Sequence, residues 1–171
     1  MSEVSVTRPP AGTTIPATLD GLIEWRRIED VMFEYCDAAD EMRIDDLMAI
    51  FTPECRYDIG FGSVLHGHAE VRAWFLDRLP KAIFTSHHVS DVRIRLTGED
   101  RAEATSFVYA RSTRVDFHSE LWGRYQDVFV KRDGVWLIDE RRLRASGFEQ
   151  TVLPPREGHG QFELIERGTA A

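Results

Sequence analysis

The sequence predicts an α+β domain in which helices come first and a mostly antiparallel sheet follows. Up to about residue 79, apolar residues recur every three or four positions, as they do in amphipathic helices. From residue 83 onward the chain consists of long strand-like runs, and Asp133-Gly134 between two of these runs is a strong hairpin signal. With 171 residues, of which 43% are hydrophobic, the chain is long enough to bury one core, so we expect a single folded domain.

Three helices are expected in the first part of the chain. Asp20 can cap the first helix, whose apolar stripe continues to Ala39. Pro53 stops a second, short helix, and Pro80 ends a third. The expected helices therefore span residues 20–40, 44–51 and 69–79.

Five strands are expected beside these helices. The first is short, from Cys55 to Ile59, and glycines at positions 60 and 62 interrupt the pattern after it. The other four follow one another directly in the sequence, which favours an antiparallel meander whose one face is covered by the helices. Turns are expected at residues 97–100, 118–120 and 132–134. The long strands span residues 83–96, 102–117, 121–131 and 135–143.

The two ends of the chain differ in composition from the middle. Residues 1–19 are rich in Ser, Thr, Pro and Gly, and we expect a flexible arm there. Residues 20–146 form the expected domain. Residues 147–171 contain Pro154-Pro155 and an apolar patch around Phe162, Leu164 and Ile165. We expect this tail to act as a lid or as a subunit contact.

Composition excludes several classes of function. The net charge of −8 with no dense basic stripe argues against a nucleic-acid partner. No stretch approaches the roughly 20 apolar residues of a membrane helix, and the first residues lack the apolar run of a signal peptide, so we expect a cytoplasmic protein without a membrane partner. Cys36 and Cys55 show no ligand spacing and are expected to be buried free thiols. His66 and His68 lack a third ligand nearby, so we expect no metal.

Several segments, taken in order, resemble those of the nuclear transport factor 2-like superfamily and in particular its SnoaL-like enzymes. The resemblance covers about residues 20–146. It implies a cone-shaped, curved, mostly antiparallel sheet that encloses a cavity together with the N-terminal helices. The segments that carry it are Tyr35-Cys36-Asp37-Ala38-Ala39-Asp40, residues 47–55, Thr85 to Ile94, Gly123-Arg124-Tyr125 and residues 133–138.

Within that superfamily, the spacing of acidic residue and histidine is similar to that of cofactor-independent lyases: scytalone dehydratase, bile-acid 7α-dehydratase and hexachlorocyclohexane dehydrochlorinase. One position departs from their pattern, because the third strand of these enzymes often carries a further polar side chain and the region around Val108 is apolar here. The resemblance implies that the catalytic residues are Asp40, His87, Tyr35, Tyr57 and Arg141.

These residue types suit an elimination without a cofactor. Such an enzyme must remove a proton from carbon, and imidazole titrates near neutral pH, so His87 is the candidate general base. A carboxylate that accepts one ring N–H fixes the tautomer, which is the role expected of Asp40. Tyr35 and Tyr57 would donate hydrogen bonds to a carbonyl, enolate or departing hydroxyl, and Arg141 would supply a positive charge for a developing anion.

Two points stay open at the level of the sequence. Neighbouring strand residues face opposite sides of a sheet, so only one histidine of the pair can point inward. Period two places His88 in phase with Ile94, whereas the resemblance favours His87. Asp40 lies at the flank of the apolar helix stripe and Tyr35 on it, so periodicity leaves open whether Asp40 is buried and whether Tyr35 only packs in the core.

The function expected from these observations is a cofactor-independent lyase of the dehydratase type. Its substrate would be a small hydrophobic polycyclic or aromatic hydroxy-ketone, with no cofactor. An isomerase or polyketide cyclase would use the same Asp/His pair. A non-catalytic ligand-binding or assembly module is the alternative from another class, because cone domains also serve as partners and carriers. Family precedent suggests a homotrimer or homodimer.

Overall fold

The computed structural model describes residue 16 and residues 18–153. Most of the expected N-terminal arm, and the expected tail beyond residue 153, lie outside the described residues. The described chain contains helices α1 (Leu19–Asp40), α2 (Ile44–Ala49) and α3 (Gly67–Arg78), a 3-10 turn η1 (Leu79–Lys81), and strands β1 (Phe51–Asp58), β2 (Val64–His66), β3 (Phe84–Leu96), β4 (Arg101–Thr113), β5 (Phe117–Arg132) and β6 (Val135–Val152).

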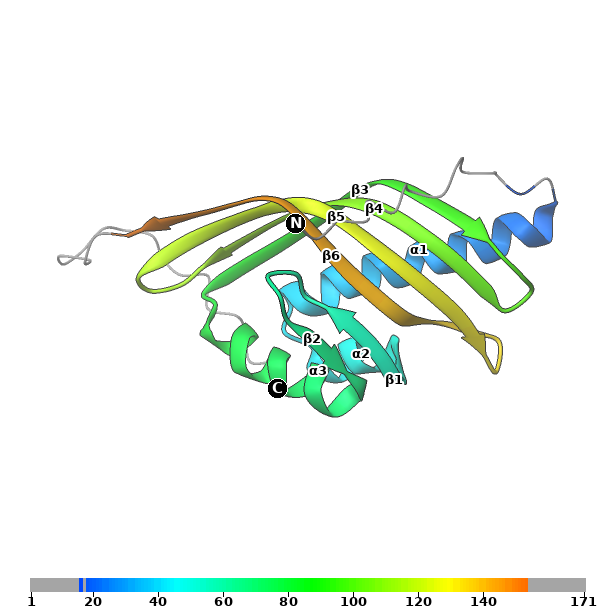
Figure 1. The fold of residues 1–171 in the computed structure, drawn as a ribbon, viewed down its shortest axis with the longest axis horizontal. Helices are drawn as coiled ribbons and strands as arrows, with labels where there is room; N and C mark the ends of the chain where they lie inside the picture. Colours follow the sequence, from blue (N-terminus) through cyan, green and yellow to red (C-terminus); the bar gives the residue numbers. More distant parts are fainter. Residues whose placement is uncertain (1–15, 17, 154–171) are drawn as a thin grey trace, which may run out of the picture.

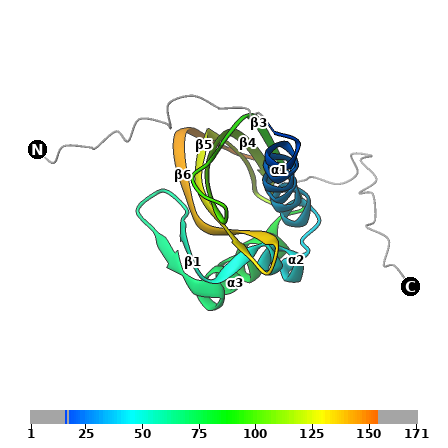
Figure 2. The same cartoon turned by 90° about the vertical axis from the view of Figure 1, so that its right-hand side faces the viewer.

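The strands form one curved, open sheet in the order β2-β1-β6-β5-β4-β3. Every pair of neighbours is antiparallel except β1 and β6, which are parallel. Figure 1 shows the long strands β3 to β6 side by side, with the helices on one side of them. Seen end-on in Figure 2, the sheet curls around an interior that α1 flanks next to β3. The predicted α+β class, with a curved and mostly antiparallel sheet, is confirmed.

The cap of the first helix lies two residues before Asp20, the expected cap. Thr18 has extended backbone angles, and its Oγ1 accepts a hydrogen bond from the Gly21 N–H at 3.2 Å. The prediction of Asp20 as the cap was therefore wrong. Asp20 instead lies in the first turn, where its negative charge interacts favourably with the helix dipole. The helix packs against β3 and β6. Its buried residues are Ile28, Met32, Tyr35, Cys36, Ala38 and Ala39.

Of two turns expected from the sequence, the structure confirms one and shows the other to be wrong. Asp133 and Gly134 both have positive φ, 50° and 80°, as a two-residue type I′ hairpin requires, so this predicted turn is confirmed. The turn expected at residues 118–120 was wrong, because these polar residues lie within β5. The chain reverses earlier, and the Arg114 N–H donates to the Phe117 carbonyl at 2.7 Å to close that turn.

Strands β1 and β6 are both longer than predicted. Strand β1 begins at Phe51 and includes Pro53, which the sequence placed at the end of a helix. Its pairing with β6 is irregular between Phe51 and Arg56, so the missing N–H of proline removes no bond from a regular ladder. Strand β6 continues to Val152, and residues 147–152 of the expected tail pair with the beginning of β5. Among the described residues, no helix is long and apolar enough to cross a membrane.

Candidate active site

A row of buried side chains crosses the concave face of the sheet and includes two of the predicted site residues. Tyr57 on β1 is in register with Arg141 on β6, and Arg141 is in register with Asp127 on β5. Residues directly opposite one another on neighbouring strands point to the same face. All three are at most 3% exposed, so the sheet itself brings them together in the interior.

Arg141 and Asp127 form a buried, two-pronged ion pair. The Arg141 Nε and Nη2 groups donate to the two carboxylate oxygens of Asp127 at 2.9 and 2.8 Å. Burial opposes the charge of Arg141, but the pairing with Asp127 outweighs burial and raises the pKa of Arg141 above its ordinary value. The Arg141 Cζ lies 4.1 Å from the ring centroid of Tyr35 and 4.3 Å from that of Tyr125, so tyrosine rings cover the guanidinium.

The hydroxyl groups of Tyr35 and Tyr57 lie 2.7 Å apart and share a hydrogen bond, although the residues come from α1 and β1. Burial holds the pKa of both phenols well above the ordinary value of 10.0. Both therefore stay protonated at neutral pH. Tyr125 also forms a side-chain hydrogen bond with Tyr35, so the three phenols make one chain of hydroxyls in which a single hydrogen is left that can be donated to a ligand.

Asp40, the last residue of α1, binds His87 through both carboxylate oxygens. Oδ1 lies 2.6 Å from the His87 Nδ1, and Oδ2 accepts a hydrogen bond from the His87 backbone N–H at 2.7 Å. The side chains of His87 and Asp40 are 16% and 24% exposed. The carboxylate fixes the ring in the tautomer that carries its proton on Nδ1, which leaves Nε2 as the nitrogen that can accept a proton.

A β-bulge in β3 decides which histidine faces inward. Ser90 pairs with Phe107 and Arg93 with Thr105, so two residues of β3 oppose a single residue of β4 between these pairs, and Asp91 has a φ of 49°. The extra residue shifts the phase of the strand. His87 therefore points to the same face as the buried Ile94, whereas uninterrupted alternation would have placed His88 there.

His88 lies on the opposite face of the sheet. Its Nε2 is 2.9 Å from Ser86 Oγ, and its ring lies 6.1 Å from that of Tyr109, its partner in register on β4. The structure thus places Asp40, His87, Tyr35, Tyr57 and Arg141 on the inner side, and it separates His88 from them.

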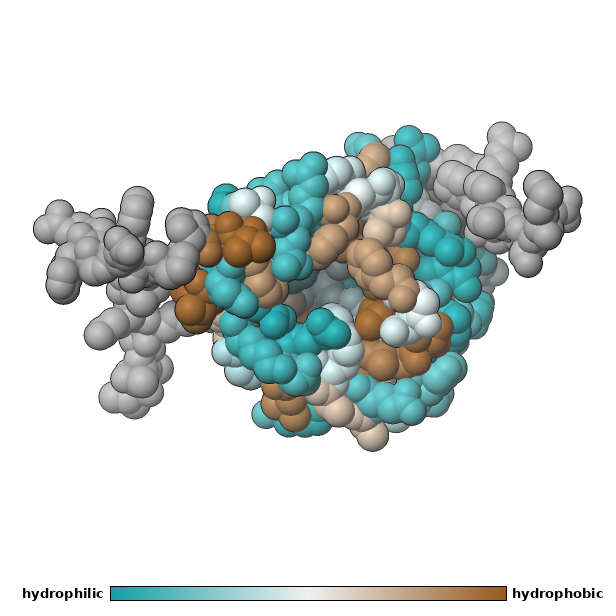
Figure 3. Space-filling view, turned by 60° about the vertical axis from the view of Figure 1, so that its left-hand side comes forward, coloured by the Kyte–Doolittle hydropathy of each residue, from teal (hydrophilic) through white to brown (hydrophobic). Residues whose placement is uncertain are grey.

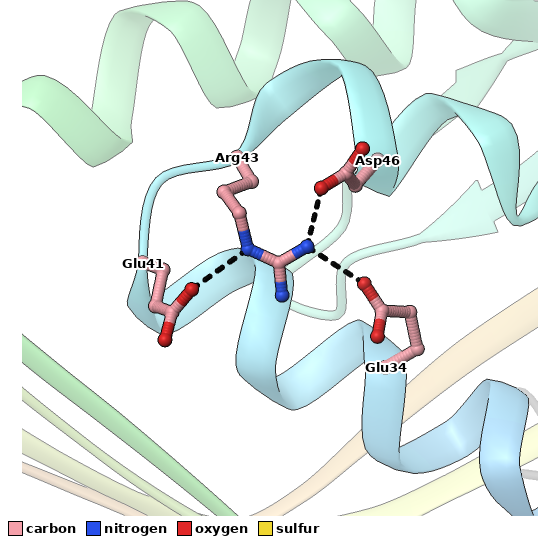
Figure 4. Close-up of polar contacts among 4 residues, drawn as sticks. All are labelled: Glu34, Glu41, Arg43 and Asp46. Atoms are coloured by element: carbon pink, nitrogen blue, oxygen red, sulfur yellow. Dashed lines mark hydrogen bonds and ion pairs between the residues drawn. The ribbon is translucent and has the colours of Figure 1, made fainter. Parts of the chain in front are cut away.

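The turn after α1 is held by a network of charged residues. Met42 adopts a left-handed φ of 58°, and the Arg43 N–H donates to the Ala38 carbonyl at 2.8 Å, which is the pattern of a Schellman cap. The Arg43 guanidinium contacts carboxylates of Glu34, Glu41 and Asp46, as Figure 4 shows. Because Glu34 belongs to α1 and Asp46 to α2, the guanidinium links the end of α1, which carries Asp40, to the first turn of α2.

Tyr35 connects the two halves of the site, which are the pair of Asp40 and His87 and the pair of Asp127 and Arg141. Its ring centroid lies 6.2 Å from that of His87 on one side, while Arg141 lies against it as described above. An open groove of about 390 Å³ between α1 and β3 reaches His87 and is lined by Phe33, Cys36, Asp37, His88 and Val89 as well. Figure 3 shows the molecule hollowed on the face turned to the viewer, with hydrophobic residues along part of the rim.

Two other histidines considered in the sequence, His66 and His68, form hydrogen bonds, and a third position, Val108, is buried. The His68 Nε2 lies 3.0 Å from the Phe51 carbonyl oxygen, and the His66 backbone N–H donates to Glu70 at 2.8 Å. In the part of the chain that the structure describes, no three His, Cys, Asp or Glu side chains are grouped as metal ligands. Val108 is buried, on the inner face of β4.

Sequence reasoning missed Asp127 and Tyr125. Both lie at alternate positions of one strand, and Asp127 directly precedes the apolar residues Val128, Phe129 and Val130. An acidic residue at the same phase as Tyr125 and Phe129 was the available signal.

Comparison with known proteins identifies the family. The sequence profile of the SnoaL-like domain matches residues 22–142. The chain belongs to the SnoaL-like domain family. A protein of Mycobacterium tuberculosis (strain H37Rv) with no characterised activity is 24% identical over 130 residues, which is 73% of this chain and 86% of that protein.

The solved structures similar to this SnoaL-like chain agree with that assignment and belong to the nuclear transport factor 2-like superfamily. One is a protein of Novosphingobium aromaticivorans DSM 12444 assigned to scytalone dehydratase, with a TM-score of 0.73 and 27% identity over 83% of this chain and 97% of that one. Another is a type 2 hexachlorocyclohexane dehydrochlorinase (LinA), with a TM-score of 0.72 and 18% identity over 84% and 97% of the two chains. At that identity, the second likeness is one of fold.

Proposed function

We propose that this SnoaL-like protein is a cofactor-independent lyase that removes water from a small hydrophobic hydroxy-ketone. The observation that carries the proposal is the hydrogen-bonded pair of Asp40 and His87. A ring nitrogen held in a fixed tautomer, with the other nitrogen left as an acceptor, is what a general base requires. This pairing favours an enzyme over a binding module, because ligand binding alone does not require a histidine held in a fixed tautomer.

In the proposed reaction, the His87 Nε2 removes a proton from the carbon next to the ketone. The electron pair of that C–H bond forms the new C=C bond, and the bond to the β-hydroxyl breaks so that water leaves. Asp40 stabilises the imidazolium that forms. The hydrogen left over in the hydroxyl chain of Tyr57, Tyr35 and Tyr125 donates to the ketone oxygen while negative charge develops on it. The proton that His87 has taken is returned to the departing hydroxyl, so the protein ends in its starting state.

Arg141 acts through the tyrosines in this proposal. Its charge is paired with Asp127, and the rings of Tyr35 and Tyr125 pack against it. It therefore positions the phenols and does not itself meet the developing anion. The apolar interior and the likeness to a protein assigned to scytalone dehydratase support a hydrophobic substrate.

A suitable test uses 3-hydroxy-1-tetralone, whose dehydration gives 1-naphthol and can be followed by fluorescence. We expect wild type to form 1-naphthol, and Asp40→Asn and His87→Gln each to lower kcat/KM by about 10²- to 10⁴-fold, the range of general acid–base assistance. His88→Gln is the matched control, because the neighbouring histidine points away, and it should retain activity within about threefold. Equal losses in His87→Gln and His88→Gln would contradict the proposal.

A further inference from the structure

The interior of this protein contains one buried positive charge that is already neutralised. Among the side chains that the structure describes, the charged ones classed as buried are Asp127 and Arg141, at 3% and 0% exposure. Every other charged group in the described part of the chain reaches solvent to a larger extent. The pair therefore dominates the electrostatic character of the concave face, and its two charges cancel.

The geometry of the pair leaves Arg141 no means of binding a second carboxylate. A guanidinium recognises carboxylates best through two parallel N–H groups, and the Nε and Nη2 edge of Arg141 is bound by Asp127. The rings of Tyr35 and Tyr125 pack against the group, with centroids 4.1 and 4.3 Å from Cζ, and the side chain of Arg141 is only 1% exposed. The remaining amino group, Nη1, is enclosed and has no hydrogen-bond partner among the described residues.

The pair of Asp40 and His87 adds negative charge close by. With His87 neutral, the two halves of the site contain the carboxylates of Asp40 and Asp127 and the guanidinium of Arg141, so their charges sum to −1. The ring of Tyr35 contacts both halves. Its centroid lies 6.2 Å from that of His87 and 4.1 Å from the Arg141 Cζ, and each of these separations is shorter than the roughly 10 Å over which charges act at moderate salt. A carboxylate placed beside His87 therefore meets repulsion, and an uncharged ligand does not.

We infer that Asp127 is a specificity-determining residue that makes this site selective for uncharged ligands. By holding Arg141 as an internal partner, it turns a potential anion-binding group into a neutral support for Tyr35 and Tyr125. The inference rests on the proposed function only in placing the ligand beside His87. The same arginine without Asp127 would attract carboxylates to the site.

The test compares two ligands of nearly equal shape, 2-acetylnaphthalene and 2-naphthoate, by isothermal titration calorimetry at pH 7.5. Wild type should bind the ketone at least about tenfold more tightly than the carboxylate. Asp127→Asn should bind 2-naphthoate about tenfold or more tighter than wild type does, because the charge of Arg141 is then uncompensated and attracts the carboxylate through space. The affinity for the ketone should change by less than about threefold. The double variant Asp127→Asn with Arg141→Gln has no charge in the pair, so it should return to the wild-type selectivity.

An unchanged affinity of folded Asp127→Asn for 2-naphthoate would overturn the inference, as would a wild type that binds 2-naphthoate as tightly as the ketone or binds neither probe. If Asp127→Asn does not fold, as judged by circular dichroism, wild type and the double variant still decide the matter. A double variant that binds 2-naphthoate tenfold more tightly than wild type would show that the pair does not set the selectivity. Because the readout is binding, loss of the proposed dehydration with retained selectivity would refute only the proposed function.

Discussion

Replacing Arg141 by methionine tests the energetic part of this description most directly. Methionine keeps an unbranched, apolar side chain against the rings of Tyr35 and Tyr125 but removes the charge. It leaves the carboxylate of Asp127, whose side chain is 0% exposed, without its partner in the interior. Breaking a buried pair in this way costs about 3–5 kcal/mol, because one charge remains buried and uncompensated. For a domain of this size, each kcal/mol lowers Tm by about 2–4 °C, so we expect a decrease of about 6–20 °C.

The matched control is Arg95→Met, which also removes the arginine of a cross-strand pair. Arg95 and Glu103 are in register on β3 and β4, but their side chains are 43% and 39% exposed. An exposed pair of this kind contributes less than about 1 kcal/mol. Urea unfolding at pH 7 measures both variants, and Arg141→Met combined with Asp127→Leu should recover much of the loss, because no unpaired charge remains. A loss in Arg141→Met no larger than that in Arg95→Met would refute the reasoning.

Two further predictions concern parts of the fold away from the ion pair. A Cβ on Gly123 would lie 2.3 Å from the backbone oxygen of Arg144, so Gly123→Ala should lower the free energy of unfolding in urea by about 1–3 kcal/mol. At Gly98 no atom lies within 4 Å of such a Cβ, so Gly98→Ala should change it by less than about 0.5 kcal/mol. Equal effects would argue against the close approach at Gly123. Hydrogen bonds from Lys131, and to a smaller extent from Trp136, hold the pKa of Glu24 below its ordinary value of 4.5 despite burial. Glu24 therefore stabilises the folded state above about pH 4.5, and this contribution is lost as the pH falls through the lowered pKa. Unfolding of Glu24→Gln from pH 7 to pH 3 should therefore show a deficit at neutral pH that disappears in acid, and a deficit of constant size would contradict this assignment.

The fold was accessible from the sequence because its signals are local. The helical stripe that ends at Asp40 and the Asp133-Gly134 turn each depend on a few neighbouring residues, and both occur in the structure as predicted. The ends of elements were less accessible. Polar residues 118–120 resemble a turn, but they are compatible with β5 because none of them is fully buried, and their strand is paired on both sides, with residues 111–113 of β4 and 149–151 of β6.

The choice between the two histidines could not come from periodicity. Alternation predicts that His88 shares a face with Ile94, and it would be correct for a regular strand. The bulge beside Asp91 breaks that relation, and nothing in the local composition announces it, because a non-glycine residue occupies the left-handed position. The resemblance placed His87 at the site since it compares whole segments, in which an irregularity is already included.

The partner of Arg141 was missed for a different reason. Asp127 and Arg141 are separated in the sequence by a complete hairpin, and their contact depends on the register of β5 against β6. Register shifts between Val128 and Phe129, so that even a correct hairpin counted outward from Asp133 would have aligned other residues. The charge of an arginine can be read from a sequence, but whether that charge is available to a ligand depends on such pairings.

The second hydrogen bond of Asp40 has a consequence for the solubility of the protein. Strand β3 lies at an edge of the sheet, and its His87 N–H points away from β4 to the carboxylate. A free N–H on an edge strand is a place where a strand of another molecule can add to the sheet. The Oδ2 atom of Asp40 accepts the hydrogen bond from this N–H, as a carbonyl oxygen of a neighbouring strand would otherwise do. Protection of the edge against aggregation and the orientation of the histidine therefore depend on the same carboxylate, so the loss of that carboxylate would remove both.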